Sequence, residues 1–357
     1  MDKIDYNYIS NAIDELVSLL GIKEDVPIDT ILEPFSAGDI KGCIENIAHY
    51  LGLPVVVNIS YVPAKYQRDS RDRFETSALV KTDRAGQGVE GITAQVSIPS
   101  YLPSYGSSGL QNFPISVKIS NNCQRHPAAF MAVMAHELSH ILLHSLRHKE
   151  KDNEFYTDLT AMVLGFSYVV LSGRKVVETR ENYASIETTT ITYGYLSDEQ
   201  FNFAFNKIDK ILEKYKDLKE KLIKKLATYK NLLSLYKKEV LKFNNFVEEL
   251  DKNPTKKIGS QDGAKIVEFH QSDYADRFTA IMRSNEARLT EINDFCVGLV
   301  HYSQPRLNSL QKHHKEIDTL ISDIKREFDL LHGNVNTLRK YVGFFYKRKI
   351  NRQSSLI

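Results

Sequence analysis

The sequence predicts an α+β protein built in two parts: a mixed domain over residues 1–197, then a long antiparallel α-helical (coiled-coil) bundle over residues 198–350. Two observations carry this prediction. Short stretches in which apolar and polar residues alternate occur before residue 120, and such alternation is typical of strands. From residue 201 onward, apolar residues recur every seven positions, as they do in coiled coils. We expect residues 351–357 to form a disordered tail.

The first part begins with helices and continues with strands. Apolar spacing predicts a helix over residues 8–20 that ends at Gly21, and another over residues 40–51 that ends at Gly52. A shorter helix is expected after Pro27. The predicted strands, rich in β-branched residues or alternating in pattern, cover residues 53–59, 78–80, 92–98 and 115–119.

A helix that follows the predicted strands carries the motif H-E-x-x-H as His136, Glu137 and His140. Residues four apart lie about 40° apart around a helix axis, so both imidazoles can approach one metal ion. Glu137 lies beside them, where its carboxylate can reach a water on the metal rather than the metal itself. Pro127 suits the first turn of this helix, where its missing N–H is not needed.

A third ligand is expected on the next helix. Glu154 and Asp158 form E-x-x-x-D a short polar link after the motif. Glu154 is predicted to complete the metal site. Asp158, one turn later, is predicted to accept a hydrogen bond from the far nitrogen of a ligand histidine and so fix its tautomer. Because a catalytic zinc keeps a fourth position open, three protein ligands favour a catalytic Zn²⁺ site.

These residues resemble the gluzincin pattern, and most closely the metallopeptidases of the ImmA/IrrE type, which often read H-E-L-G-H-x-L-L-H followed by E-x-x-A-(N/D). This chain reads H-E-L-S-H-I-L-L-H and E-F-Y-T-D, with Ser139 for the usual Gly and Thr157 for the usual Ala. The resemblance implies a zincin-like metallopeptidase domain. It also implies a zinc-dependent endopeptidase, often one that acts on a regulatory protein.

Two further features bear on how a peptide would be processed. Tyr193 and Tyr195 flank Gly194, and either hydroxyl could donate a hydrogen bond to the developing oxyanion. An exposed edge strand could bind the substrate by strand addition, with residues 92–98 as the first choice and 115–119 as the second. The alternative is that both strands are internal.

The heptads of the second part fill two seams, interrupted only by Lys219. A turn is expected over residues 251–263, a weaker helix over 264–301 and a break at Pro305 before the last helix. The apolar residues spaced by seven are Phe201, Ile208, Tyr215, Leu222, Tyr229, Tyr236, Phe243 and Leu250, and, in the last helix, Leu310, Ile317, Ile324, Leu331, Leu338 and Phe345.

Composition favours a cytoplasmic protein. Three cysteines lie far apart without a C-x-x-C motif, which indicates a reducing compartment. We expect no signal peptide and no membrane span, because the longest apolar run, near residues 161–171, is too short. Residues 1–205 hold 17 basic and 25 acidic residues, and residues 206–357 hold 30 and 20. This basic half lacks any nucleic-acid-binding motif, so nucleic acid is not the expected partner.

Two classes of function follow. The first is a soluble zinc metallopeptidase whose helical part recruits or senses a protein substrate. The second is a non-catalytic partner-binding or signalling protein with a structural or vestigial zinc site, in which the helices bind a coiled-coil partner or a second copy. Glu137 discriminates between them, because a purely structural site has no use for a carboxylate beside the metal.

Overall fold

In the computed structural model, the described residues are 5–63, 74–76, 81–82, 94–182, 185–251 and 274–341. The chain divides into two compact units, each described here by itself: Met1–Lys214 with Val300–Gln304, and Tyr215–Leu299 with Pro305–Ile357. The first unit thus ends at Lys214 rather than at residue 197, and it includes a short segment from much later in the chain. The predicted strand at 78–80, the turn at 251–263 and the tail at 351–357 lie outside the described residues, apart from Asp251 at the end of α7.

The first unit opens with three helices, as predicted: α1 (Tyr6–Leu20), α2 (Ile28–Ser36) and α3 (Ile40–Leu51). Asp5 and Asp39 cap α1 and α3 by accepting hydrogen bonds from backbone N–H groups. Gly52 ends α3 in the left-handed conformation. A two-residue strand, β1 (Ile22–Lys23), follows α1.

The main sheet has the order β2-β6-β5-β3, with β2 (Val55–Val62) parallel to β6 (Phe113–Ser120) and the other pairs antiparallel. β5 (Ala94–Ser97) lies between β6 and β3 (Phe74–Thr76). Both strands proposed as the cleft edge are therefore internal, and that prediction is wrong. Alternation of apolar and polar residues predicts a strand and its buried face, but it does not predict which strands lie on either side of it.

Helices α3 and α4 cover one face of this sheet, since α3 contacts β2 and α4 contacts β5. The strand residues that face them are apolar and buried, and α4 is itself enclosed, with buried residues around its whole circumference. They are Val55, Val57, Val96, Ile115, Val117 and Ile119.

The metal motif lies on α4 (Pro127–Ser145), and α5 (Glu154–Ala161) follows it. A π-helical segment, η3 (Met162–Phe166), interrupts the second helix before α6 (Ser167–Gly173). The stretch Glu154–Gly173 is long and apolar enough to cross a membrane, but 72% of its most apolar 18-residue window is buried inside the protein. Most of this apolar surface is therefore covered by other parts of the protein.

A β-hairpin that sequence reasoning did not assign follows α6. Strands β7 (Lys175–Asn182) and β8 (Ser185–Thr192) pair antiparallel, and β4 (Lys81–Thr82) joins β8. The hairpin leads into α7 (Asp198–Asp251), a single helix. The first turns of α7 belong to the first unit, where Phe201, Ala204 and Ile208 are buried.

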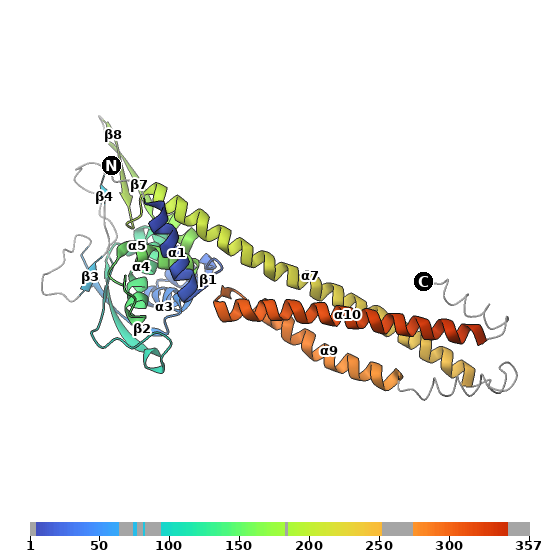
Figure 1. Cartoon of the computed structure of the whole chain (residues 1–357). Helices are drawn as coiled ribbons and strands as arrows, with labels where there is room; N and C mark the ends of the chain where they lie inside the picture. Colours follow the sequence, from blue (N-terminus) through green and yellow to red (C-terminus); the bar gives the residue numbers. More distant parts are fainter. Residues whose placement is uncertain are drawn as a thin grey trace. The chain divides into compact units, whose positions relative to one another are not determined.

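The second unit consists of the rest of α7 with α9 (Tyr274–Val297) and α10 (Gln304–Tyr341), which lie side by side (Figure 1). Contacts at Lys225–Asp318 and Tyr236–Phe328 show that α7 and α10 run in the same direction. Contacts at Arg288–Glu316 and Phe295–His313 show that α9 runs opposite to α10. Buried heptad residues such as Leu222, Leu226, Tyr229, Leu233, Tyr236 and Val240 on α7, with Leu310, Ile317 and Ile324 on α10, form its core. The predicted seven-residue periodicity thus does specify a helical bundle.

Candidate metal centre

The two histidines of the motif project from the same side of α4. Both are buried, His136 with 6% and His140 with 2% exposure. Their rings lie 5.0 Å apart between centroids and are almost perpendicular. The four-residue spacing on a regular helix produces this arrangement, as the sequence predicted.

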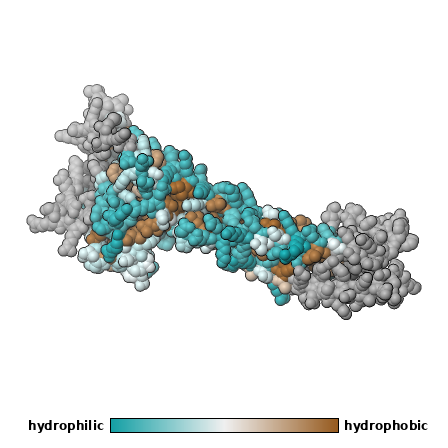
Figure 2. Space-filling view, in the orientation of Figure 1, coloured by the Kyte–Doolittle hydropathy of each residue, from teal (hydrophilic) through white to brown (hydrophobic). Residues whose placement is uncertain are grey.

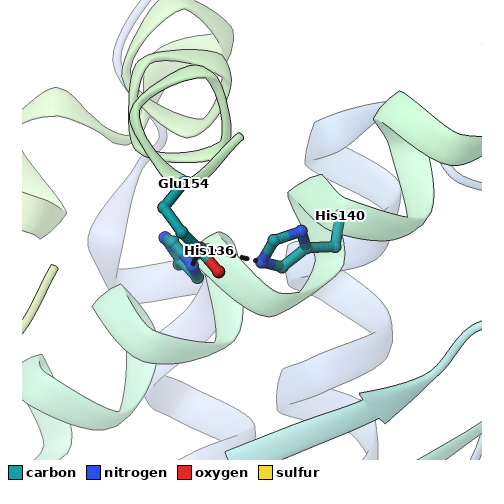
Figure 3. A group of neighbouring side chains, drawn as sticks. All are labelled: His136, His140 and Glu154. Carbon is teal, nitrogen blue, oxygen red and sulfur yellow. Dashed lines mark hydrogen bonds and ion pairs between the residues drawn. The ribbon is translucent and has the colours of Figure 1, made fainter. Parts of the chain in front are cut away.

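Glu154 comes from the first turn of α5 and reaches toward both rings (Figure 3). Its Oε2 lies 3.1 Å from His136 Nε2 and 3.2 Å from His140 Nε2. Two atoms bound to one tetrahedral zinc at about 2.1 Å lie about 3.4 Å apart, so these separations fit a shared ion. All three candidate ligand atoms lie within 4.8 Å of one another. The three residues can therefore hold a metal ion, and their nitrogen and oxygen donors suit zinc.

The start of α5 places this carboxylate. Asn153 caps the helix by accepting a hydrogen bond from Phe155 N–H at 3.0 Å. Its side-chain amide donates to the hydroxyl of Tyr8 on α1 at 2.7 Å. Nearby, Tyr156 donates to Glu15 at 2.9 Å. Helix α1 thus anchors the turn that presents Glu154.

Asp158 fixes the first histidine, as predicted. Its Oδ1 lies 2.6 Å from His136 Nδ1, so that this nitrogen donates and Nε2 stays available for a metal. Burial opposes protonation of His136, but the charge and hydrogen bond of Asp158, then Glu154 and Glu137, raise its pKa to about 10. The surroundings thus strongly favour a positive charge at this position.

Thr157 fixes the second histidine. Its hydroxyl donates to the carbonyl of Asn153 at 3.2 Å and lies 3.3 Å from His140 Nδ1, from which it can accept. His140 Nε2 is then directed to Glu154. Thr157 is one of the two residues at which the sequence departs from the ImmA/IrrE pattern, and this departure supplies a hydrogen-bond partner that alanine lacks.

The ligand carboxylate is held in its ionised form. Burial alone would raise the pKa of Glu154, but hydrogen bonds and positive charge from His136 and His140 outweigh it and lower the pKa to about 2. An ionised carboxylate is the form that coordinates metals.

Glu137 is fully buried beside the ligands. It lines a small cavity of about 20 Å³ together with His136, Asp158, Arg174 and Tyr193. By the size of a water molecule, this cavity holds about one. The position agrees with a carboxylate that acts on a reacting water rather than on the metal.

The two predicted tyrosines occupy different places. The ring of Tyr195 stacks on His136, with centroids 5.7 Å apart and an interplanar angle of 22°. Burial, then the charges of Glu154, Glu137 and Asp158, raises the pKa of Tyr195, whose hydroxyl hydrogen-bonds Glu154. This hydroxyl therefore stays protonated and can donate. Tyr193 is buried and lines the small cavity.

Gly194 allows the tyrosine segment to approach Asp158. Its φ is +87°, and an added Cβ would lie 3.2 Å from Asp158 Oδ2. That oxygen accepts hydrogen bonds from the backbone N–H of Tyr195 at 2.7 Å and of Leu196 at 3.2 Å. A single carboxylate thus joins His136 on α4 to the segment that leads into α7.

Arg174, at the end of α6, is a residue that sequence reasoning missed. It is 6% exposed, donates to the carbonyl of Leu196 at 2.8 Å and lies over the ring of Phe201 at 4.3 Å. It also lines the cavity beside Glu137. No sequence motif identifies this residue, because its partners lie after the hairpin and in the first turn of α7, both remote in sequence.

An open, shallow groove of about 490 Å³ lies beside Glu154, the third candidate ligand. Glu154 and Tyr195 form its inner wall, and the link between α4 and α5 forms its rim. The rim residues are Lys149, Glu150, Asp152, Asn153 and Phe155. Glu154 is therefore the candidate ligand that borders this open surface.

No protein-family model, curated protein or solved structure matches this chain. The resemblance to gluzincins therefore rests on the motif residues and their geometry alone.

Proposed function

We propose that the protein is a zinc-dependent endopeptidase that cleaves a protein partner. The observation that carries the proposal is the position of Glu137, fully buried next to three residues that can share one metal ion. When bound, zinc supplies Lewis acidity that polarises a carbonyl and lowers the pKa of water. The residues that would hold it are His136, His140 and Glu154.

The remaining steps fall to the chain's own side chains. Glu137 accepts the proton of the attacking water and delivers it to the leaving amine. Tyr195, whose raised pKa keeps its hydroxyl protonated, donates a hydrogen bond to the oxyanion. The groove along Asn153 and Phe155 admits the polypeptide. This division of roles is that of a gluzincin, and the ImmA/IrrE type remains the family we propose.

A purely structural or vestigial zinc site is the alternative. It explains the ligands but gives no reason to bury a carboxylate beside them, since an unused buried charge is costly. We therefore favour the enzyme. A finding that Glu137 is not required for peptide cleavage would favour the non-catalytic role.

The helical unit serves, in this proposal, to recruit or sense the partner. Leu235 and Leu241 on α7 are each 52% exposed, and brown patches interrupt the hydrophilic surface of Figure 2. Apolar surface of this kind suits a coiled-coil partner or self-association. The three cysteines are free and buried, in keeping with a cytoplasmic location.

The direct test compares wild-type protein with Glu137→Gln on a library of unstructured peptides, read by mass spectrometry for new termini. We expect cleavage by the wild type and none by the variant, because the amide cannot accept the proton. Both proteins should bind zinc equally. Glu33→Gln, an exposed change on α2, is the matched control and should cleave normally. Cleavage by Glu137→Gln at the wild-type rate would refute the proposed mechanism.

A further inference from the structure

One short strand of the first unit comes from the middle of the second. β9 (His301–Tyr302) lies between α9 and α10 in sequence, yet Val300–Gln304 belongs to the first unit. The chain leaves the first unit along α7, returns to it at Val300–Gln304 and then continues into the second unit as α10. A simple turn between two helices would not need this excursion.

β9 is held in the first unit by β1 and by Glu24. It pairs antiparallel with β1, with Ile22 opposite Tyr302 and Lys23 opposite His301. Tyr302 is 1% exposed and donates its hydroxyl hydrogen to Glu24 at 2.6 Å. The N–H of Glu24 donates in turn to the carbonyl of Val300 at 2.8 Å.

The segment after β1 is attached to the helix that carries the third ligand. Val26 N–H donates to the carbonyl of Gly165 at 2.9 Å. Gly165 has φ +96°, and an added Cβ would lie 2.5 Å from the carbonyl oxygen of Glu24. It belongs to η3, which directly continues α5 with its residues Glu154 and Asp158. The pairing of β9 with β1, three hydrogen bonds and one close contact thus connect β9 to the end of the helix that carries Glu154.

The residue just before the segment Val300–Gln304 is fixed inside the helical unit. Leu299, the residue before Val300, is fully buried, and its carbonyl accepts a hydrogen bond from Lys219 Nζ at 2.8 Å. Lys219 is the one residue that interrupts the apolar heptad seam of α7. Its position at a seam is explained by this bond to the junction with β9.

We propose that β9 is a coupling strand, through which the state of the helical unit sets the geometry of the metal centre. A shift of the junction at Leu299 moves β9, then β1, then η3, and so displaces Glu154 relative to the two histidines. Closely packed and hydrogen-bonded elements transmit such shifts because they cannot deform freely. Tyr302 and Lys219 are positioning residues in this scheme. The inference rests on the proposed metal site but not on peptide hydrolysis.

Tyr302→Phe in the full chain tests the first link. The change removes one hydroxyl and keeps the buried ring. We expect zinc affinity, measured by competition with a chelator, to fall by about fivefold or more, within the usual range of coupling between sites. The visible absorption spectrum of the Co²⁺-loaded protein should change shape, because it reports ligand geometry. Tyr50→Phe, which removes a hydroxyl bonded to Thr30, is the control and should change neither.

Lys219→Met tests the link inside the helical unit. Methionine fits an apolar seam but cannot bond the Leu299 carbonyl. We expect the same change in the Co²⁺ spectrum as for Tyr302→Phe, although the substitution lies in the other unit. Lys225→Met is the matched control on the same helix, since it removes only the ion pair with Asp318. Its Co²⁺ spectrum should equal that of the wild type.

Amide hydrogen exchange of the metal-free protein separates this inference from the metal proposal. Tyr302→Phe and Lys219→Met should both speed exchange in Met162–Phe166, and neither control should. If the wild type bound no zinc yet this exchange changed, the metal site would be wrong and the coupling right. Unchanged exchange, zinc affinity and Co²⁺ spectrum in both variants would overturn the coupling strand.

Discussion

Each histidine of the candidate metal centre is held at its Nδ1 atom by a side chain of α5. Asp158 binds Nδ1 of His136, and Thr157 lies at Nδ1 of His140. The same helix carries Glu154, so one rigid element both supplies a ligand and orients the other two. Such support lowers the entropy lost when a metal binds, because the donors already point inward.

Asp158→Ala should weaken zinc binding by about 10–100-fold, the usual effect of losing a partner behind a ligand. The change also leaves two backbone N–H groups, that of the half-buried Tyr195 and that of the buried Leu196, without their acceptor. Zinc affinity should be measured by chelator competition. Asp152→Ala, an exposed carboxylate on the groove rim, is the control and should bind zinc as the wild type does. Equal affinity of the two variants would show that Asp158 only packs or caps.

Individual site residues could be predicted from the sequence where both the residue type and the spacing along a helix indicate the role. His136, His140, Glu154 and Asp158 could be placed because their helices are regular and their roles depend on residue type. Arg174 could not be placed, since its partners at Leu196 and Phe201 become neighbours only after the hairpin folds. Thr157 looked like a neutral departure from a family pattern until the position of His140 was known.

At the scale of elements, the main surprise is the interruption of the second site helix. The helix that carries Glu154 and Asp158 continues to Gly173, but η3 is inserted at its middle. Glycine in a buried apolar run signals close approach of another backbone, which here is Glu24. The identity of that backbone depends on tertiary packing and cannot be read from the local sequence.

Gly165→Ala should destabilise the protein more than Gly38→Ala. Both glycines have positive φ, +96° and +82°, so both substitutions carry a backbone cost of about 1–2 kcal/mol. Only Gly165 adds a clash, since no atom lies within 4 Å of a Cβ at Gly38. We expect an extra loss of about 1–3 kcal/mol in the free energy of unfolding, as in other overpacked sites. Urea unfolding measures it, and equal losses would contradict the close approach.

For the whole molecule, heptad periodicity correctly predicted long helices but not how they divide between the units. Periodicity shows that a helix face is apolar, not which element covers it. The first turns of α7 pack within the first unit: Arg174 lies over the ring of Phe201, and Lys207 bonds Ser10 and Asp14. The return of β9 was equally hidden, because two residues of strand carry no periodic signal.

A chain that ends at residue 198 should therefore be less stable than one that ends at residue 214. The shorter chain loses the buried side chains of Phe201 and Ile208, each worth about 1.5–3 kcal/mol when buried. For a domain of about 200 residues, each kcal/mol of unfolding free energy shifts the melting temperature by about 2–4 °C. We expect a difference of at least about 5 °C by calorimetry. Both chains lack β9, so the comparison isolates the first turns of α7, and identical melting would contradict their place in the first unit.

The metal content of the purified full chain tests the central claim most directly. We expect about one zinc per chain in the wild type and little in His140→Ala, because two remaining ligands hold the ion poorly. His49→Ala, an exposed histidine on α3, is the matched control and should keep its zinc. A wild type without stoichiometric zinc, or a His140→Ala protein with as much zinc as the wild type, would contradict the proposed metal centre.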